Sequence, residues 1–131
     1  MKYQLTGLFA LCFSIDTWAE VVTDGSLGAI ADLTGPDFQI ESSLGQQQGS
    51  NLFHSFQDFN LNPLESATFI AESGTDNIIA RVTGGASNIN GLLNSPVNLY
   101  FFNPAGIVIG PSATLNIQGA LHLSTAETLQ F

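Results

Sequence analysis

Positive charge is nearly absent from this sequence. Two of its 131 residues are Lys or Arg and 11 are Asp or Glu, which gives a formal net charge of −9. Lys2 lies at the extreme N-terminus, so Arg81 is the one base in the rest of the chain. Such a chain cannot neutralise a row of phosphates, which argues against nucleic-acid binding, and an anionic membrane surface would repel it.

Cysteine and charge of either sign are also scarce. The single cysteine, Cys12, lies within the first 19 residues, so a chain processed after them would hold no disulfide. Charged residues make up 10% of the sequence, well below the usual quarter. Polarity comes instead from Asn, Gln, Ser and Thr. With 13 glycines, this composition is typical of stacked strands, where charged side chains would lie over like charges.

Side chains that carry catalysis or bind metals are few and scattered. Neither His54 nor His122 is accompanied by Cys or by a second His at ligand spacing, so we expect no metal and no cofactor. We expect His54 to be a partly buried or edge residue and His122 to lie on the polar face of its strand. Asp58 and Glu65 flank a turn and are expected to be solvated turn residues rather than a catalytic carboxylate pair. The sequence therefore predicts no enzyme.

Residues 1–19 have the pattern of a secretory signal peptide. Lys2 supplies the positive start, residues 5–15 are mostly apolar, and Thr17 and Ala19 are small residues at the two positions that matter before cleavage. The apolar run is shorter than the roughly 20 residues needed to span a bilayer, so we expect cleavage after Ala19 and no stable membrane insertion. A buried N-terminal helix is the alternative. Residues 20–131 suit one domain.

The rest of the sequence predicts short strands joined by turns. Residues 21–49 have a loose texture, with one short strand at residues 38–40 and an exposed loop at residues 45–49. Residues 113–123 alternate well between apolar and polar side chains, which predicts a strand. The apolar face of that strand carries Leu115, Ile117, Leu121 and Leu123. Further strand candidates are residues 67–70, 77–82, 97–102 and 107–109.

A weak internal repeat relates residues 88–93 to residues 116–121, at an offset of 28 residues. In both copies an Ile is followed by a polar residue and then a Gly. A period of about 20 to 30 residues suits one coil of a β-solenoid, in which each turn stacks its strands on the turn before it.

Two apolar runs within residues 98–110 are separated by Asn103, Pro104, Ala105 and Gly106. These four residues fit a type I turn. An Asn in the first position accepts a hydrogen bond from the backbone two residues on, Pro in the second presets φ, and Gly suits the fourth. Chemistry alone therefore predicts a well-formed turn between two strands.

This turn and its strands, with further stretches at residues 51–60 and 79–91, resemble the haemagglutination-activity or two-partner secretion domain. That domain forms the N-terminus of filamentous-haemagglutinin-type exoproteins, and the resemblance covers about residues 21–125. It implies an all-β fold, a right-handed parallel β-helix (β-solenoid) with an N-terminal cap. Residues 20–131 would be a two-partner secretion domain truncated at the C-terminus, because the sequence ends inside a strand expected from Thr128 onward.

The resemblance also implies a function in secretion. The domain would be the secretion signal of a large exoprotein that crosses the inner membrane through the general secretory machinery. An outer-membrane transporter barrel with periplasmic POTRA domains would recognise and export it. The protein would therefore be secreted or displayed on the surface of a Gram-negative-type cell, via the periplasm.

The family motif maps onto Asn103, Pro104, Gly106 and Ile107, either as partner-recognition residues or as a structural turn. Ala105 departs from the motif, which usually has Asn there. The nearest candidate for the family's other Asn-Pro motif is residues 62–64.

Two other functions stay open. A structural adhesin fragment would bind surfaces or carbohydrate through its solenoid. A β-helix polysaccharide lyase would need clustered acids for calcium and a strong base, for which the chain offers Arg81 and scattered acids. We expect Arg81 to pair with Glu72 or Asp76 as a structural contact.

Overall fold

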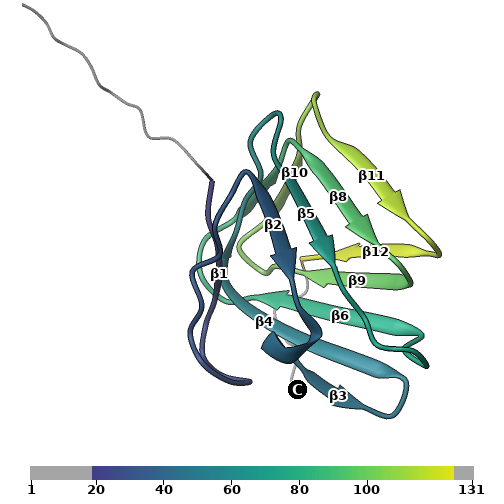
Figure 1. Ribbon diagram of the computed structural model, residues 1–131. Helices are drawn as coiled ribbons and strands as arrows, with labels where there is room; N and C mark the ends of the chain where they lie inside the picture. The colour runs from purple at the N-terminus through teal and green to yellow at the C-terminus, as the bar shows by residue number, and fades with distance from the viewer. Residues whose placement is uncertain (1–18, 126–131) are drawn as a thin grey trace, which may run out of the picture.

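The computed structural model describes residues 19–125, which form an all-β parallel β-solenoid of about three turns (Figure 1). This confirms the fold class expected from the sequence. Nearly all of the expected signal peptide and the strand expected from Thr128 lie outside the described residues. The strands are β1 (Val21–Thr23), β2 (Asp37–Ile40), β3 (Gln46–Gln48), β4 (Asn51–Phe59), β5 (Ser66–Phe69), β6 (Asn77–Val82), β7 (Ser87–Ile89), β8 (Leu92–Ser95), β9 (Asn98–Phe102), β10 (Ile107–Ile109), β11 (Thr114–Ile117) and β12 (Leu121–Ser124).

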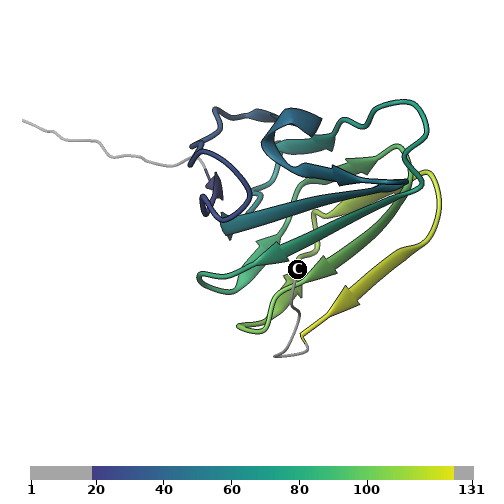
Figure 2. The same ribbon diagram turned by 90° about the horizontal axis from the view of Figure 1, so that it is seen from below.

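Three sheets run along the solenoid. The long sheet has the order β1-β4-β6-β9-β12, with β3 also pairing with β4. The second sheet has the order β11-β8-β5-β2, and the short sheet pairs β10 with β7. Figure 2 shows the coils stacked in chain order, from the N-terminal strands to β11 and β12. Every pairing between coils is parallel, because each coil places one strand in the same direction in each sheet.

An antiparallel cap closes the N-terminal end of the long sheet. Strands β1 and β3 both pair antiparallel with β4. The expected loop at residues 45–49 is therefore wrong, because residues 46–48 form β3, although all three side chains are exposed as expected. Gly49 makes the tight turn into β4 with a φ of +60°, which glycine adopts without strain. Three consecutive glutamines show no alternation, so their pairing depends on backbone contacts that the sequence pattern does not reveal.

The narrow interior is filled by alternating side chains of the strands. Along β6, for example, Ile78, Ala80 and Val82 are buried and the residues between them are half-buried. The ring of Phe59 links several coils, since its centroid lies 5.0 Å from Phe101 and 6.1 Å from Phe69. Full burial of each such side chain contributes about 1.5–3 kcal/mol, and the solenoid has no disulfide to add to this. The largest buried side chains are Phe38, Phe56, Phe59, Phe69, Phe101, Ile40, Leu52, Leu61, Ile78, Ile89, Leu93 and Leu99.

The coils are shorter than the sequence repeat suggested. Asn116 pairs with Asn94, 22 residues earlier, and Asn98 bonds to Asn77, 21 residues earlier. The repeat at an offset of 28 residues is therefore wrong as a coil register, because Ile89 lies in the short sheet and Ile117 in the second sheet.

The predicted strand at residues 113–123 is in fact two strands, β11 and β12, separated by a corner at Gly119, whose φ is +157°. The four apolar residues assigned to one face do stack on inward positions of the preceding coil. Leu115 and Leu123 remain 39% and 43% exposed, because no further coil among residues 19–125 covers them. No helix in this part of the chain has the length and apolarity that a membrane crossing requires.

Candidate functional site

The Asn103 turn leads from β9 in the long sheet to β10 in the short sheet. The N–H of Gly106 donates to the carbonyl oxygen of Asn103 over 3.0 Å, and the N–H of Ala105 donates to Oδ1 of Asn103 over 2.9 Å. These are the contacts expected of a type I turn that begins with Asn. Gly106 has a φ of +125°, which strains any residue other than glycine. The turn residues therefore satisfy the geometry that the sequence predicted.

The side chain of Asn103 is buried and bonded to the coil beneath it. Its Nδ2 group donates to the carbonyl oxygen of Gly85 over 3.0 Å and to Oγ of Ser87 over 2.9 Å. Its backbone N–H donates to the carbonyl oxygen of Ser124, in the following coil. Asn103 is 0% exposed, so its side chain contacts its own chain and not the solvent. In the folded state this motif residue holds the solenoid corners together.

The outward part of the turn is small and apolar. Pro104 and Ala105 are exposed, whereas Ile107 is half-buried and packs against the core. Ala105 uses its backbone N–H inside the turn, and its methyl group faces solvent. The departure from the family motif at Ala105 therefore leaves the turn closed and changes the surface alone. A partner that touches the folded turn meets Pro104 and Ala105.

A second Asn-Pro turn lies at residues 62–65, between the short and second sheets. The N–H of Glu65 donates to the carbonyl oxygen of Asn62, and the Glu65 carboxylate accepts the N–H of Asn62 over 2.8 Å. Glu65 is only 3% exposed, so the expectation of a solvated turn residue is wrong. The spacing of Asn62 and Glu65 resembles a capping box, which is the sequence signal for this reciprocal bonding. Leu64 is 99% exposed with a φ of +71°.

A polar network joins the N-terminal cap to the long sheet. Asp24 accepts hydrogen bonds from the hydroxyls of Ser55 (2.6 Å), Thr83 (2.8 Å) and Ser26 (2.7 Å). Burial acts to raise the pKa of Asp24, but these hydrogen bonds outweigh it and lower the pKa to about 2. The Arg81 guanidinium donates to Oγ of Ser55 over 2.7 Å and to Oγ of Ser26 over 3.0 Å. Arg81 thus has the structural role expected for it, with serines of this network as partners.

The two histidines differ sharply. His54 is 0% exposed, so the expectation of a partly buried or edge residue is wrong. Its two ring nitrogens have no hydrogen-bond partner, and its ring centroid lies 5.7 Å from Phe56 and 5.5 Å from Phe69. Burial lowers the pKa of His54 to about 4, so the ring is neutral at pH 7. His122 is exposed as expected and stacks on Tyr100, with centroids 4.5 Å apart.

No group of three His, Cys, Asp or Glu side chains within residues 19–125 is arranged to hold a metal ion. Comparison with known families gives one match: the model of the TPS secretion domain, where TPS denotes two-partner secretion, matches residues 19–131. No curated protein and no solved structure matches the chain.

Proposed function

The chain belongs to the TPS secretion-domain family, and on that premise we propose that a dedicated outer-membrane barrel exports it. The family match supports a secretion-signal role in a two-partner secretion exoprotein. The observation that carries the proposal is the extent of this match, from residue 19 to residue 131. The family is one of secretion and recognition, not of catalysis.

The route that we propose has two membrane crossings. The leader pattern of residues 1–19 directs the chain through the general secretory machinery into the periplasm. There the POTRA domains of the barrel bind the domain, and the barrel releases it outside the cell or at the surface. The residues after the leader contain no cysteine, so an oxidising periplasm cannot lock them by disulfides before they enter a pore.

The edge of the solenoid at β11 and β12 supports recognition by strand addition. Within residues 19–125, β11 and β12 each pair with a strand on one side only. Exposed main-chain groups at such an edge bind an added strand through backbone hydrogen bonds. The Asn103 turn is near this edge, because Asn103 bonds to Ser124 of β12. We propose that the partner's periplasmic domains contact this end of the domain.

The export proposal is tested by producing the chain with and without its cognate barrel and assaying the medium and the periplasm. We expect the processed chain in the medium when the barrel is present and in the periplasm when it is absent. Equal amounts in the medium under both conditions, with an intact outer membrane, would contradict the proposal.

The role of the turn in recognition needs a separate comparison. Asn103→Ala removes a buried structural side chain, whereas Pro104→Ala changes an exposed one. Undiminished export of the variant with both substitutions would exclude recognition through the turn. Lost export in Pro104→Ala, with an unchanged unfolding midpoint, would assign recognition to the exposed part of the turn.

A further inference from the structure

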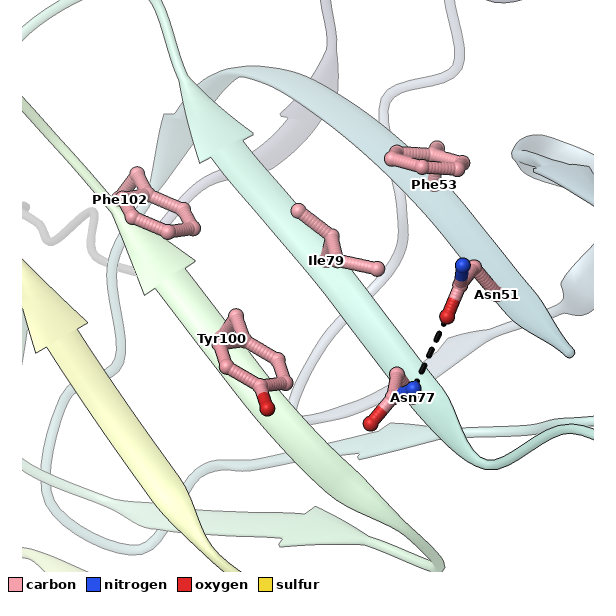
Figure 3. Close-up of a pocket in the computed structure, with 6 residues that line it drawn as sticks. All are labelled: Asn51, Phe53, Asn77, Ile79, Tyr100 and Phe102. Carbon is pink, nitrogen blue, oxygen red and sulfur yellow. Dashed lines mark hydrogen bonds between the residues drawn. The ribbon is translucent and has the colours of Figure 1, made fainter. Parts of the chain in front are cut away.

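A groove crosses the outer face of the long sheet, over the middle strands β4, β6 and β9 (Figure 3). Its volume is about 320 Å³, at the lower end of the range of about 300–1,000 Å³ typical of ligand sites. Six half-buried side chains line it: Asn51, Phe53, Asn77, Ile79, Tyr100 and Phe102. No residue of the Asn103 turn belongs to this set, so the groove is separate from the family motif.

The register of the sheet gives the groove an aromatic wall on each side of an aliphatic floor. Ile79 of β6 pairs with Phe53 of β4 on one side and with Tyr100 of β9 on the other. Adjacent strands lie about 4.8 Å apart, so the two rings are separated by about 10 Å across Ile79. Figure 3 shows the rings of Phe53, Tyr100 and Phe102 around Ile79. His122 of β12 stacks on Tyr100 with an interplanar angle of 4°, which extends the flat aromatic surface.

A row of amides borders one end of the groove. Nδ2 of Asn77 donates to Oδ1 of Asn51 over 2.9 Å, as Figure 3 shows, and Nδ2 of Asn98 donates to Oδ1 of Asn77 over 3.1 Å. Each side-chain amide has two N–H donors and two acceptor lone pairs. The row therefore fixes the orientation of its members with part of its hydrogen-bonding capacity and retains the rest for a ligand.

Charge and sheet topology restrict what the groove can bind. The chain has a formal net charge of −9, yet no Asp, Glu, Lys or Arg is among the lining residues. An ionic ligand would find no counter-charge there. Strands β4, β6 and β9 each have a neighbour on both sides, so a peptide cannot add to them by backbone hydrogen bonds. Binding must come from the faces of the rings and from the amides.

We propose that this groove binds an uncharged oligosaccharide. A pyranose ring has an apolar C–H face, which packs on the Tyr100 ring, and hydroxyl groups at its edge, which bond to the amides of Asn77 and Asn51. Flat rings beside fixed amides in an uncharged groove match both halves of that chemistry. This inference does not depend on the export proposal, because it concerns a face of the folded domain.

Intrinsic tyrosine fluorescence tests the proposal directly. The sequence has two Tyr and one Trp, and Tyr3 and Trp18 both lie in the leader, so the emission of the processed chain comes from Tyr100. The secreted chain is titrated with cellohexaose, chitohexaose and maltohexaose, and with polygalacturonate as a charged probe. We expect a saturable change with at least one neutral hexasaccharide and none with polygalacturonate.

Variants then locate the binding, measured by calorimetry so that loss of Tyr100 does not remove the signal. Tyr100→Ala should weaken the affinity about tenfold or more, whereas Tyr100→Phe keeps the ring and most of the affinity. Leu64→Ala removes an exposed apolar side chain elsewhere and should change nothing.

Three results would overturn the proposal: no binding of any neutral hexasaccharide, equal binding by Tyr100→Ala, or stronger binding of polygalacturonate. Concentration-dependent dimerisation that Tyr100→Ala abolishes, without sugar binding, would assign the groove to a second copy of the chain instead. Export is scored separately in the same strains. Failed export with intact sugar binding would refute the export proposal alone, and the reverse result would refute this one alone.

Discussion

The side chain of Asn103 donates a 2.9 Å hydrogen bond to Oγ of Ser87, a residue of the preceding coil. Ser87 is itself 0% exposed, so this bond lies inside the corner where two successive coils stack. A solenoid is held mainly by its sheets, and its corners are where the sheet hydrogen bonding is interrupted. The first residue of the family motif therefore cross-links two corners, and its conformational role is defined before any partner is considered.

Asn103→Ala should lower the free energy of unfolding by about 1–3 kcal/mol. The substitution leaves the Ser87 hydroxyl without its partner in a buried position, and a buried polar group that loses its hydrogen bond costs about this much. The measurement is urea unfolding followed by far-ultraviolet circular dichroism. Pro104→Ala is the matched control, because this neighbour is exposed and its replacement should change stability by about 1 kcal/mol or less. Equal midpoints for the two variants would contradict the role assigned to Asn103.

Local features of the fold could be predicted from the sequence, and features set by coil stacking could not. The turn at Asn103 depends on four consecutive residues, so its hydrogen bonds follow from residue type. The inward alternation of Leu115 and Ile117 is also local. By contrast, the partners of Asn103 at Gly85 and Ser87 depend on coil length, and the coils vary between 21 and 26 residues.

The same reasoning explains the mistakes about polar residues. His54 alternates with Leu52 and Phe56 on β4, so the strand pattern alone directs it into the core. The sequence analysis allowed a polar ring partial exposure, and the structure shows that packing among Phe rings took precedence. Glu65 was expected in solvent because it follows a turn, but its carboxylate is needed by the N–H of Asn62. Burial of a polar side chain depends on neighbours that become adjacent only on folding.

Acid should destabilise the domain through His54. The pKa of this residue is about 4 in the folded state, against a model value of 6.5, so the unfolded chain binds a proton first as the pH falls. Stability is therefore constant above about pH 6.5 and declines as the pH falls from there toward 4. A shift of this size corresponds to about 3 kcal/mol. Urea unfolding at a series of pH values measures the slope.

His54→Leu should remove that slope and leave stability at pH 7 within about 2 kcal/mol, because an apolar side chain then replaces an unpaired ring. A wild-type slope that persists in His54→Leu would show that another group titrates. Asp24 does not interfere, since its pKa falls from 3.8 to about 2 on folding. Its contribution is present above about pH 3.8 and is lost only as the pH falls from there toward 2.

Asp24→Asn should loosen the N-terminal cap before it affects the solenoid. The carboxylate accepts hydrogen bonds from Ser55 and Thr83, whereas an amide keeps one acceptor oxygen in place of two. We expect a loss on the order of 1 kcal/mol, discounted because the site is partly solvated. Hydrogen exchange at the N–H of Thr23, which bonds to Ala31, should speed up several-fold while exchange at Ile78 in β6 is unchanged. Asp32→Asn, at an exposed position, is the control and should leave both rates unchanged.

Two substitutions at positive φ should act in opposite directions. Leu64 has a φ of +71° and is 99% exposed, so Leu64→Asn relieves backbone strain without losing buried area and should stabilise the domain by up to about 1 kcal/mol. Gly106 has a φ of +125°, so Gly106→Ala introduces strain of about 1–3 kcal/mol even though the nearest side-chain atom, in Ala86, leaves room for a methyl group. Thermal unfolding of the two variants side by side measures both effects. Because neither change disturbs the core, a destabilised Leu64→Asn or an unaffected Gly106→Ala would show that these turns relax freely and do not fix the corners of the solenoid.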